Sequence, residues 1–231
     1  MRIYGIPGSS SDRLLRRRLR AHRLVGLAAA GAVVLAVAVG RPATAVVVVL
    51  VGILARRHLR GRAAAADLGS QTEIIVAHRL RRFRPDVLLF DVDLRDRRAD
   101  VDAVVLGPVA ATIEVKTARG RAQYLDDGRV RVGGRWLPGR PLAQAASHAA
   151  AVGRWSPVHV EAILCLSGMW GRPRLVEYGA TEVWVTSARH LRRVLRRLPR
   201  VLDRPTARRL ADRLRDGRRK NASPDARRSV H

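Results

Sequence analysis

The sequence is poor in cysteine, lysine and aromatic residues, and each scarcity limits what the chain can be. Its single cysteine, Cys165, excludes an intramolecular disulfide and a zinc site built from several cysteines. The apolar neighbours of Cys165 predict a buried, unreactive thiol. Aromatic residues form 4% of the chain, which predicts no aromatic platform for stacking single-stranded nucleic acid. Neither a glycine-rich phosphate loop nor a serine–histidine–aspartate set is present.

Basic residues are abundant, and almost all of them are arginine. The 231 residues include 45 Lys+Arg and 19 Asp+Glu, for a net charge of +26. This length predicts one globular domain with an appended segment, and this charge indicates an anionic partner, either nucleic acid or an acidic membrane surface. The two lysines are Lys116 and Lys220. A lysine at 116, inside an apolar strand, indicates a site that needs a compact ammonium group rather than a guanidinium.

The first part of the chain has the pattern of a membrane segment. A basic stretch (1–23) precedes an apolar run (24–55) that is interrupted at Gly40-Arg41-Pro42, and a basic linker (56–68) follows. The run is too apolar for a soluble surface helix. Three arrangements fit: a transmembrane helical hairpin that turns at 40–42, a single tilted span, or a signal peptide cleaved after Ala45. The distribution of positive charge favours the hairpin, with both basic flanks on anionic lipid and the globular domain on the cytoplasmic side of the cell membrane.

The remaining sequence alternates strand-like and helix-like segments, which predicts an α/β (α+β) fold with a globular domain over 69–200. A capping-box pattern predicts a helix that begins at Ser70, after a small-residue linker. Asp91 and Asp93 are predicted to be exposed acids on an edge strand. The region 201–231 is predicted to hold a basic helix and a disordered tail from Asp216. The expected strands are 87–94, 101–106, 111–116, 160–166 and 182–186, with a hairpin at 120–136 and helices at 141–153, 189–198 and 206–215.

Two of these strands place acidic residues together. A Gly-Pro turn joins them, and a three-residue loop at 107–109 sets Asp102 directly across from Glu114. Two carboxylates on one face repel each other, so a cation is needed beside them. Lys116 is one candidate, and a divalent cation is another. Hard cations such as Mg²⁺ bind one or two carboxylates together with water and phosphate oxygens. This combination is typical of a site that cleaves phosphodiesters.

The segment Asp-Val-Asp-Ala-Val-Val-Leu-Gly-Pro (100–108), followed by Ile-Glu-Val-Lys (113–116), resembles the nuclease-related domain (NERD) family. That family is similar to the PD-(D/E)xK nuclease superfamily, and the resemblance runs from about Gly69 to Ser187. It implies a mixed central β-sheet flanked by helices, restriction-endonuclease-like, with a centre that uses Mg²⁺ (or Mn²⁺). By the same resemblance, Glu73 lies on the family's first helix and Gln144 on its Pro-x-x-Gln helix. Ala103 stands where the family usually has histidine.

These observations predict a membrane-anchored, Mg²⁺-dependent nuclease-like domain that acts on nucleic acid, DNA rather than RNA. In this hypothesis Asp102 and Glu114 bind the metal ion and Lys116 stabilises the phosphate. Glu73 and Gln144 support them, although Glu73 also suits the structural part of a capping box. His148, four residues after Gln144, is expected to be structural. The alternatives are an inactive nucleic-acid-binding module and a membrane scaffold addressed to lipid. An arginine stripe at 192–197 either follows a phosphate backbone or forms a solvated face.

Overall fold

The computed structural model describes residues 1–5, 7, 20, 24, 27–35, 38–39, 42–93 and 100–221. The chain divides into two compact units. The first comprises Met1–Gly8 with Thr72–His231, and the second comprises Ser9–Gln71. Each is considered by itself.

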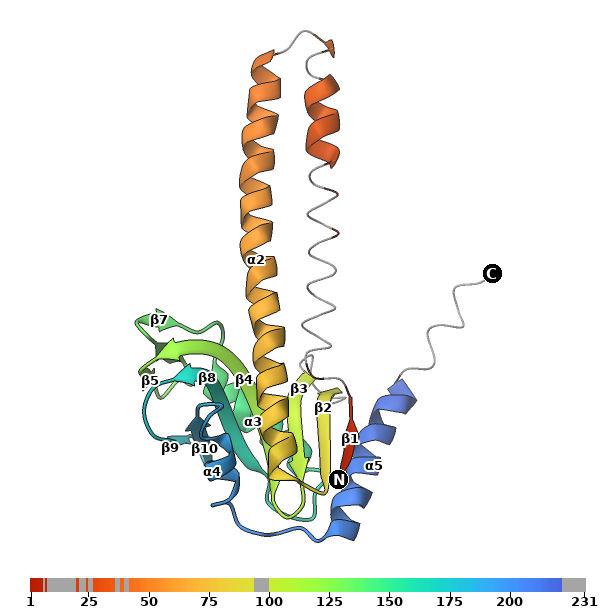
Figure 1. Ribbon diagram of the computed structural model, residues 1–231, viewed down its shortest axis with the longest axis vertical. Coiled ribbons are helices and arrows are strands. Elements are labelled where there is room, and N and C mark those ends of the chain that lie inside the picture. The colour runs from red at the N-terminus through yellow and green to blue at the C-terminus, as the bar shows by residue number, and fades with distance from the viewer. Residues whose placement is uncertain are drawn as a thin grey trace, which may run out of the picture. The chain divides into compact units, whose positions relative to one another are not determined.

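The first unit is built on a seven-stranded mixed sheet with the order β1-β2-β3-β4-β8-β10-β9 (Figure 1). Neighbours β2, β3 and β4 are antiparallel, whereas β8 is parallel to both β4 and β10. A separate three-stranded sheet contains β5, β6 and β7. The strands are β1 (Arg2–Tyr4), β2 (Val87–Asp93), β3 (Asp100–Leu106), β4 (Ala110–Gly120), β5 (Ala122–Tyr124), β6 (Val130–Val132), β7 (Arg135–Trp136), β8 (Glu161–Met169), β9 (Arg174–Tyr178) and β10 (Thr181–Thr186).

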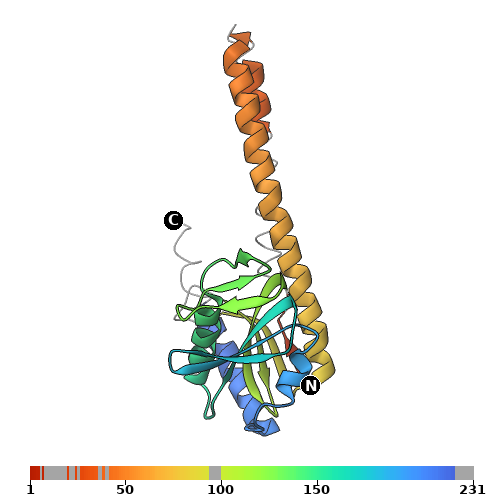
Figure 2. The same cartoon turned by 90° about the vertical axis from the view of Figure 1, so that its left-hand side faces the viewer.

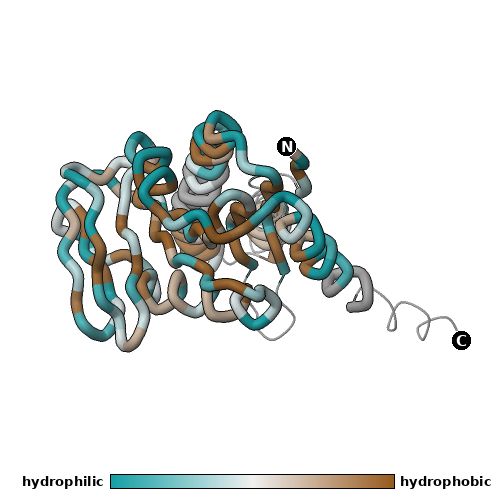
Figure 3. The backbone as a smooth tube through the Cα atoms, turned by 90° about the horizontal axis from the view of Figure 1, so that it is seen from below, coloured by the Kyte–Doolittle hydropathy of each residue, from teal (hydrophilic) through white to brown (hydrophobic). Residues whose placement is uncertain are grey.

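Helices cover both faces of the large sheet (Figure 2). Helices α3 (Pro141–Gly153) and α5 (Arg204–Asn221) pack on one face. The last turns of α2 (Pro42–Phe83) and helix α4 (Leu191–Leu195) pack on the other. Successive side chains of a strand point to opposite faces of the sheet. Val104 therefore lies in the core under α3, and Val105 lies in the core under α2 and α4. The hydrophobic stretches run through the interior strands, coloured brown in Figure 3. The predicted mixed sheet flanked by helices is therefore confirmed.

Most of the predicted elements are present, and some have different bounds. Helix α3 occupies 141–153 as predicted, with proline in its first turn. Helix α4 is shorter than predicted, and strands β1 and β9 were not predicted. These two strands have 3 and 5 residues, too few to show a clear alternation. Helix α5 extends to Asn221, so the predicted disorder from Asp216 is wrong up to that residue, and 222–231 lie outside the described residues.

Two further predictions are corrected. Helix α2 runs unbroken from Pro42, so no helix begins at Ser70 and the linker before it is helical. The four alanines at 63–66 explain this, because alanine has the highest helix propensity. Asp91 is not an exposed acid on an edge strand. Asp91 is only 2% exposed, whereas Asp93 is exposed as predicted. Strand β1 pairs with Val87–Leu89, so that part of β2 is not an edge.

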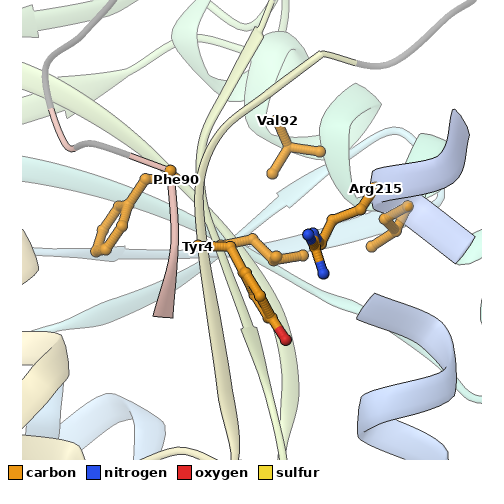
Figure 4. Close-up of a pocket in the computed structure, with 7 residues that line it drawn as sticks. Tyr4, Phe90, Val92 and Arg215 are labelled. Atoms are coloured by element: carbon orange, nitrogen blue, oxygen red, sulfur yellow. The ribbon is translucent and has the colours of Figure 1, made fainter. Parts of the chain in front are cut away.

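The N-terminal strand is held to the sheet by its backbone and by a side-chain contact. Tyr4 pairs with Leu89 of β2, and the guanidinium carbon of Arg215 in α5 lies 4.0 Å from the centre of the Tyr4 ring. Figure 4 shows these two side chains beside Phe90 and Val92, at a cavity of about 240 Å³. Cation–π contacts of this kind contribute about 0.5–2 kcal/mol. The sheet of the first unit thus includes residues from the very start of the chain.

The second unit contains helical residues 27–35 and the first part of α2. A Cβ atom at Gly52 would lie 3.1 Å from Cβ of Ala29, so the two helices are in close contact there. Large apolar side chains on both helices are exposed, among them Leu27 at 71% and Leu54 at 66%. Among the described residues, no helix has the length and apolar character required to cross a membrane. The predicted turn at Gly40-Arg41 and most of 1–23 lie outside the described residues.

Candidate active site

The β3–β4 hairpin brings the two predicted acids to the same end of the sheet. Its observed register pairs Leu106 with Ala110 and Ala103 with Ile113, around a turn at 107–109. Gly107 has a φ of 76°, a conformation that glycine adopts without strain. In this register Asp102 and Glu114 are the next positions along the two strands, on the face covered by α3. The predicted loop length and strand register are confirmed.

Asp102 is held against the backbone of β4 in a place where its charge is disfavoured. Its Oδ2 accepts a hydrogen bond of 2.6 Å from the backbone N–H of Val115. Burial raises the pKa of Asp102 well above its usual value, and the nearby charge of Glu114 raises it further. The charge of Glu73 acts in the same direction, whereas the hydrogen bond from Val115 and the ammonium of Lys116 partly offset these effects. Asp102 therefore interacts electrostatically with three other predicted site residues.

Glu114 is the most buried acid of the site, with 1% of its side chain exposed. Its Oε1 lies 2.6 Å from Nζ of Lys116, which is two residues further along β4 on the same face. Its Oε2 lies 3.1 Å from Nδ1 of His148 on α3. These last two atoms are close but not aligned as a hydrogen bond, and neither has another hydrogen-bond partner among the described residues. A buried carboxylate oxygen in this condition is a good ligand for a cation or for water.

His148 is the site residue that sequence reasoning undervalued. Only 2% of its side chain is exposed, and its ring reaches Glu114 from the helix that packs on β4 and β8. The sequence contained a signal, because His148 follows Gln144 by one helical turn in a helix whose other buried residues are all apolar. With Nδ1 only 3.1 Å from Oε2 of Glu114, the His148 ring limits how far that carboxylate can move toward α3.

The two supporting residues lie on the flanking helices. Glu73 is half-buried on α2, close enough for its charge to act on Asp102. The neighbouring Thr72 makes a hydroxyl–hydroxyl hydrogen bond of 2.9 Å with Thr117 of β4, which ties this turn of α2 to the strand of the site. Gln144 is half-buried on α3, one turn from His148. The structure therefore brings Asp102, Glu114, Lys116 and His148 together, with Glu73 nearby.

The donor set is suited to a hard divalent cation. No group of three or more His, Cys, Asp or Glu side chains that could hold a metal ion occurs in the described parts of the chain. Mg²⁺ does not require such a group, because one or two carboxylates with water and substrate oxygens are sufficient. Asp102 and Glu114 are two such carboxylates, and burial together with the nearby charge of Glu114 raises the pKa of Asp102, so a bound cation would offset the repulsion between the two acids. The residues present fit Mg²⁺ or Mn²⁺.

Cys165 lies on β8, paired with Val115, and is fully buried. Burial raises the pKa of its thiol to about 12, and the nearby charge of Asp102 contributes in the same direction. The predicted burial is confirmed.

The order of elements and the site together define the class of this domain. The chain forms a helix, three antiparallel strands, a second helix and a strand parallel to β4, in this order. An aspartate lies on β3 and a Glu-x-Lys sequence lies on β4. This arrangement is consistent with the PD-(D/E)xK nuclease-like superfamily. Residues 68–167 match the family model of the nuclease-related domain (NERD), so this segment of the chain is a nuclease-related domain. The match suggests a nuclease-like function and binding of nucleic acid. No curated protein and no solved structure gives a significant match to the chain.

Proposed function

We propose that this chain is a membrane-anchored, metal-dependent nuclease that hydrolyses nucleic-acid phosphodiesters and has a restriction-endonuclease-like domain. The observation that carries the proposal is the meeting of Asp102, Glu114 and Lys116 at one end of the β3–β4 hairpin. Two acids can hold a divalent cation, and that cation together with the ammonium of Lys116 would attract a phosphate group, which carries negative charge. DNA is the first substrate to test.

In the proposed reaction, the oxygen of a water molecule bonds to phosphorus while the bond from phosphorus to the leaving sugar oxygen breaks. The water loses a proton to solvent and the sugar oxygen takes one up, so the products are a phosphomonoester and a hydroxyl group. Asp102 and Glu114 would hold Mg²⁺ or Mn²⁺, which when bound stabilises negative charge on the phosphate oxygens. Lys116 is 25% exposed, so its ammonium is able to contact a phosphate oxygen or hold the water. His148 positions Glu114 from the buried side. Glu73 and Gln144 supply polar groups at the edges of the site.

Cleavage assays on the purified full-length chain test this proposal. We expect the parent to cut labelled DNA in Mg²⁺ and not in chelator, and Glu114→Gln to slow cleavage at least about a hundredfold. Glu177→Gln is the matched control, because Glu177 is an exposed acid on β9 outside the site. Equal cleavage by the parent and Glu114→Gln would refute the assignment. Metal-independent binding without cleavage by the parent would instead favour an inactive nucleic-acid-binding module.

We further propose that residues 24–55 anchor the chain in the cell membrane, with the globular domain on the cytoplasmic side and the basic flanks on anionic lipid. The exposed apolar side chains support this anchor, because monomeric soluble proteins rarely expose contiguous apolar patches of large area. The basic flank at 56–60 is helical, and its side chains are not among those that the structure describes.

Alkaline extraction of membranes from cells that produce the full chain tests the anchor. Arginine at both Leu50 and Ile53, which are 55% and 56% exposed, should release the chain into the soluble fraction. Arginine at both Ile74 and Ile75 is the matched control, since these residues are 53% and 52% exposed on the same helix outside the apolar run. Release of the parent, or equal release of both variants, would argue against an anchor at 24–55.

A further inference from the structure

A second site lies at the far ends of β4 and β8, where a cleft combines arginines with aromatic side chains. Its volume is about 670 Å³. Three arginines line it, here called the cleft arginines: Arg121, Arg172 and Arg174. The aromatic residues Tyr124 and Trp170 and the methionine Met169 line it as well. Among the described residues that line the cleft, none is acidic. The cleft is therefore positively charged and has aromatic surface, although the chain as a whole is poor in aromatic residues.

The fold fixes both aromatic residues of the cleft in place. The backbone N–H of Trp170 donates a hydrogen bond of 2.8 Å to the carbonyl of Gly120, the last residue of β4. The side chain of Trp170 is nevertheless 58% exposed. Tyr124 is half-buried, and its hydroxyl donates to the sulfur of Met169 at 3.6 Å. Burial raises the pKa of Tyr124, and the nearby Arg174 guanidinium partly offsets this. An exposed indole on a rigid backbone offers a face on which an unpaired base can stack.

The cleft and the candidate active site lie along one side of one strand. Ala118, Ala122, Tyr124 and Met169 all belong to or pack on the core under α3, the helix that also carries His148 beside Glu114. Gly120, the last residue of β4, is four positions after Lys116, which is at most about 13 Å in an extended strand because the register shifts between Lys116 and Arg119. A few nucleotides of an extended single strand span this distance. A strand with its phosphate at Lys116 would reach the cleft.

We propose that this cleft binds the single-stranded part of a nucleic acid next to the phosphodiester that is cut, with a base on Trp170 and phosphates on the cleft arginines. The part of this proposal that concerns cleavage next to the bound strand rests on the proposed nuclease function. Its binding component does not depend on cleavage. An unpaired base is required, because the bases inside a duplex are stacked on one another and cannot lie on an indole ring.

The first test is fluorescence anisotropy with the full-length chain, a labelled single-stranded oligonucleotide and chelator to prevent cleavage. Trp170→Ala should weaken binding roughly tenfold, and Trp170→Phe should restore most of it, because a base also stacks on phenylalanine. Trp136→Ala is the matched control. Trp136 is 50% exposed outside the cleft, and its ring is already covered by Arg129 at 5.1 Å and Arg131 at 5.8 Å. Equal losses for Trp170→Ala and Trp136→Ala would overturn the proposal.

The second test separates the cleft from the general positive charge of the chain. Replacing the cleft arginines by alanine should weaken binding and reduce the slope of log affinity against log salt by up to about 2, since each phosphate contact contributes about 0.7. The control removes the same charge from three exposed arginines of α2 that do not line the cleft: Arg79, Arg81 and Arg82. Equal losses in the two triple variants would contradict a defined site.

These results are independent of catalysis. If the parent cleaves DNA while the cleft variants bind and cleave as the parent does, the cleft proposal fails and the nuclease proposal stands. If the cleft variants lose binding while the parent does not cleave, the chain is a binding module and the cleft proposal stands. Tighter binding of a perfect duplex than of a single strand would overturn the single-strand assignment.

Discussion

Replacing Lys116 by methionine removes the ammonium that lies 2.6 Å from Oε1 of Glu114. The carboxylate left behind is 1% exposed, and breaking a buried ion pair by removing one partner costs about 3–5 kcal/mol. Lys116 itself is 25% exposed, so solvent screens the pair, and we expect a loss of about 2 kcal/mol. For a domain of this size, that loss lowers the melting temperature by about 4–8 °C.

Thermal unfolding in chelator, followed by circular dichroism, measures this loss. The double variant Lys116→Met/Glu114→Gln should regain most of the stability, because it leaves no uncompensated carboxylate at position 114. Arg129→Met is the control. Arg129 and Asp127 form an ion pair with the same 2.6 Å separation at the surface, and we expect its loss to leave the melting temperature unchanged. A double variant as unstable as Lys116→Met alone would refute the reasoning that charge balance holds this site together.

Three further predictions concern other parts of the first unit. Because burial and the charge of Glu114 raise the pKa of Asp102 in the folded chain, ionised Asp102 lowers the free energy of unfolding. This loss of stability is absent at pH values below the usual aspartate pKa and is complete above the raised pKa of Asp102. In chelator at neutral pH, Asp102→Asn should therefore stabilise the fold by roughly 1 kcal/mol, and unfolding near pH 4 should show a smaller difference from the parent. Cys165, with a buried thiol of pKa about 12, should react with a thiol reagent at pH 8 only after unfolding; rapid reaction of the folded chain would contradict its burial. Tyr4→Ala should lower the free energy of unfolding by about 1–2 kcal/mol, through loss of the contact with Arg215, and an unchanged urea midpoint would show that β1 does not stabilise the sheet.

The sequence was most informative where local chemistry alone decides the structure. The Gly-Pro turn set the register of β3 and β4, so the position of Asp102 relative to Glu114 followed from counting residues. Helix α3 could be bounded because proline begins it and glycine ends it. The scarcity of lysine drew attention to Lys116, which the structure places on Glu114. In each case a few neighbouring residues carried the information.

Features that depend on distant parts of the chain could not be predicted in this way. His148 became part of the site because α3 packs on β4, and no local pattern specifies that contact. Strand β1 joins the sheet across about 80 residues of intervening chain, and its 3 residues are too few to show a period. Composition gave no sign of the aromatic cleft, because Tyr124 and Trp170 are far apart in sequence and meet through the pairing of β4 with β8. The capping box at Ser70 was overridden by the helix that precedes it.

The proposed nuclease function requires that Asp102 and Glu114 together hold a divalent cation. Titration of Mn²⁺ into the full-length chain, followed by electron paramagnetic resonance of the free ion, tests it most directly. We predict one Mn²⁺ site that competes with Mg²⁺, that is lost in the Asp102→Asn/Glu114→Gln double variant, and that is retained in Glu177→Gln. Undiminished Mn²⁺ binding by the double variant would contradict the claim.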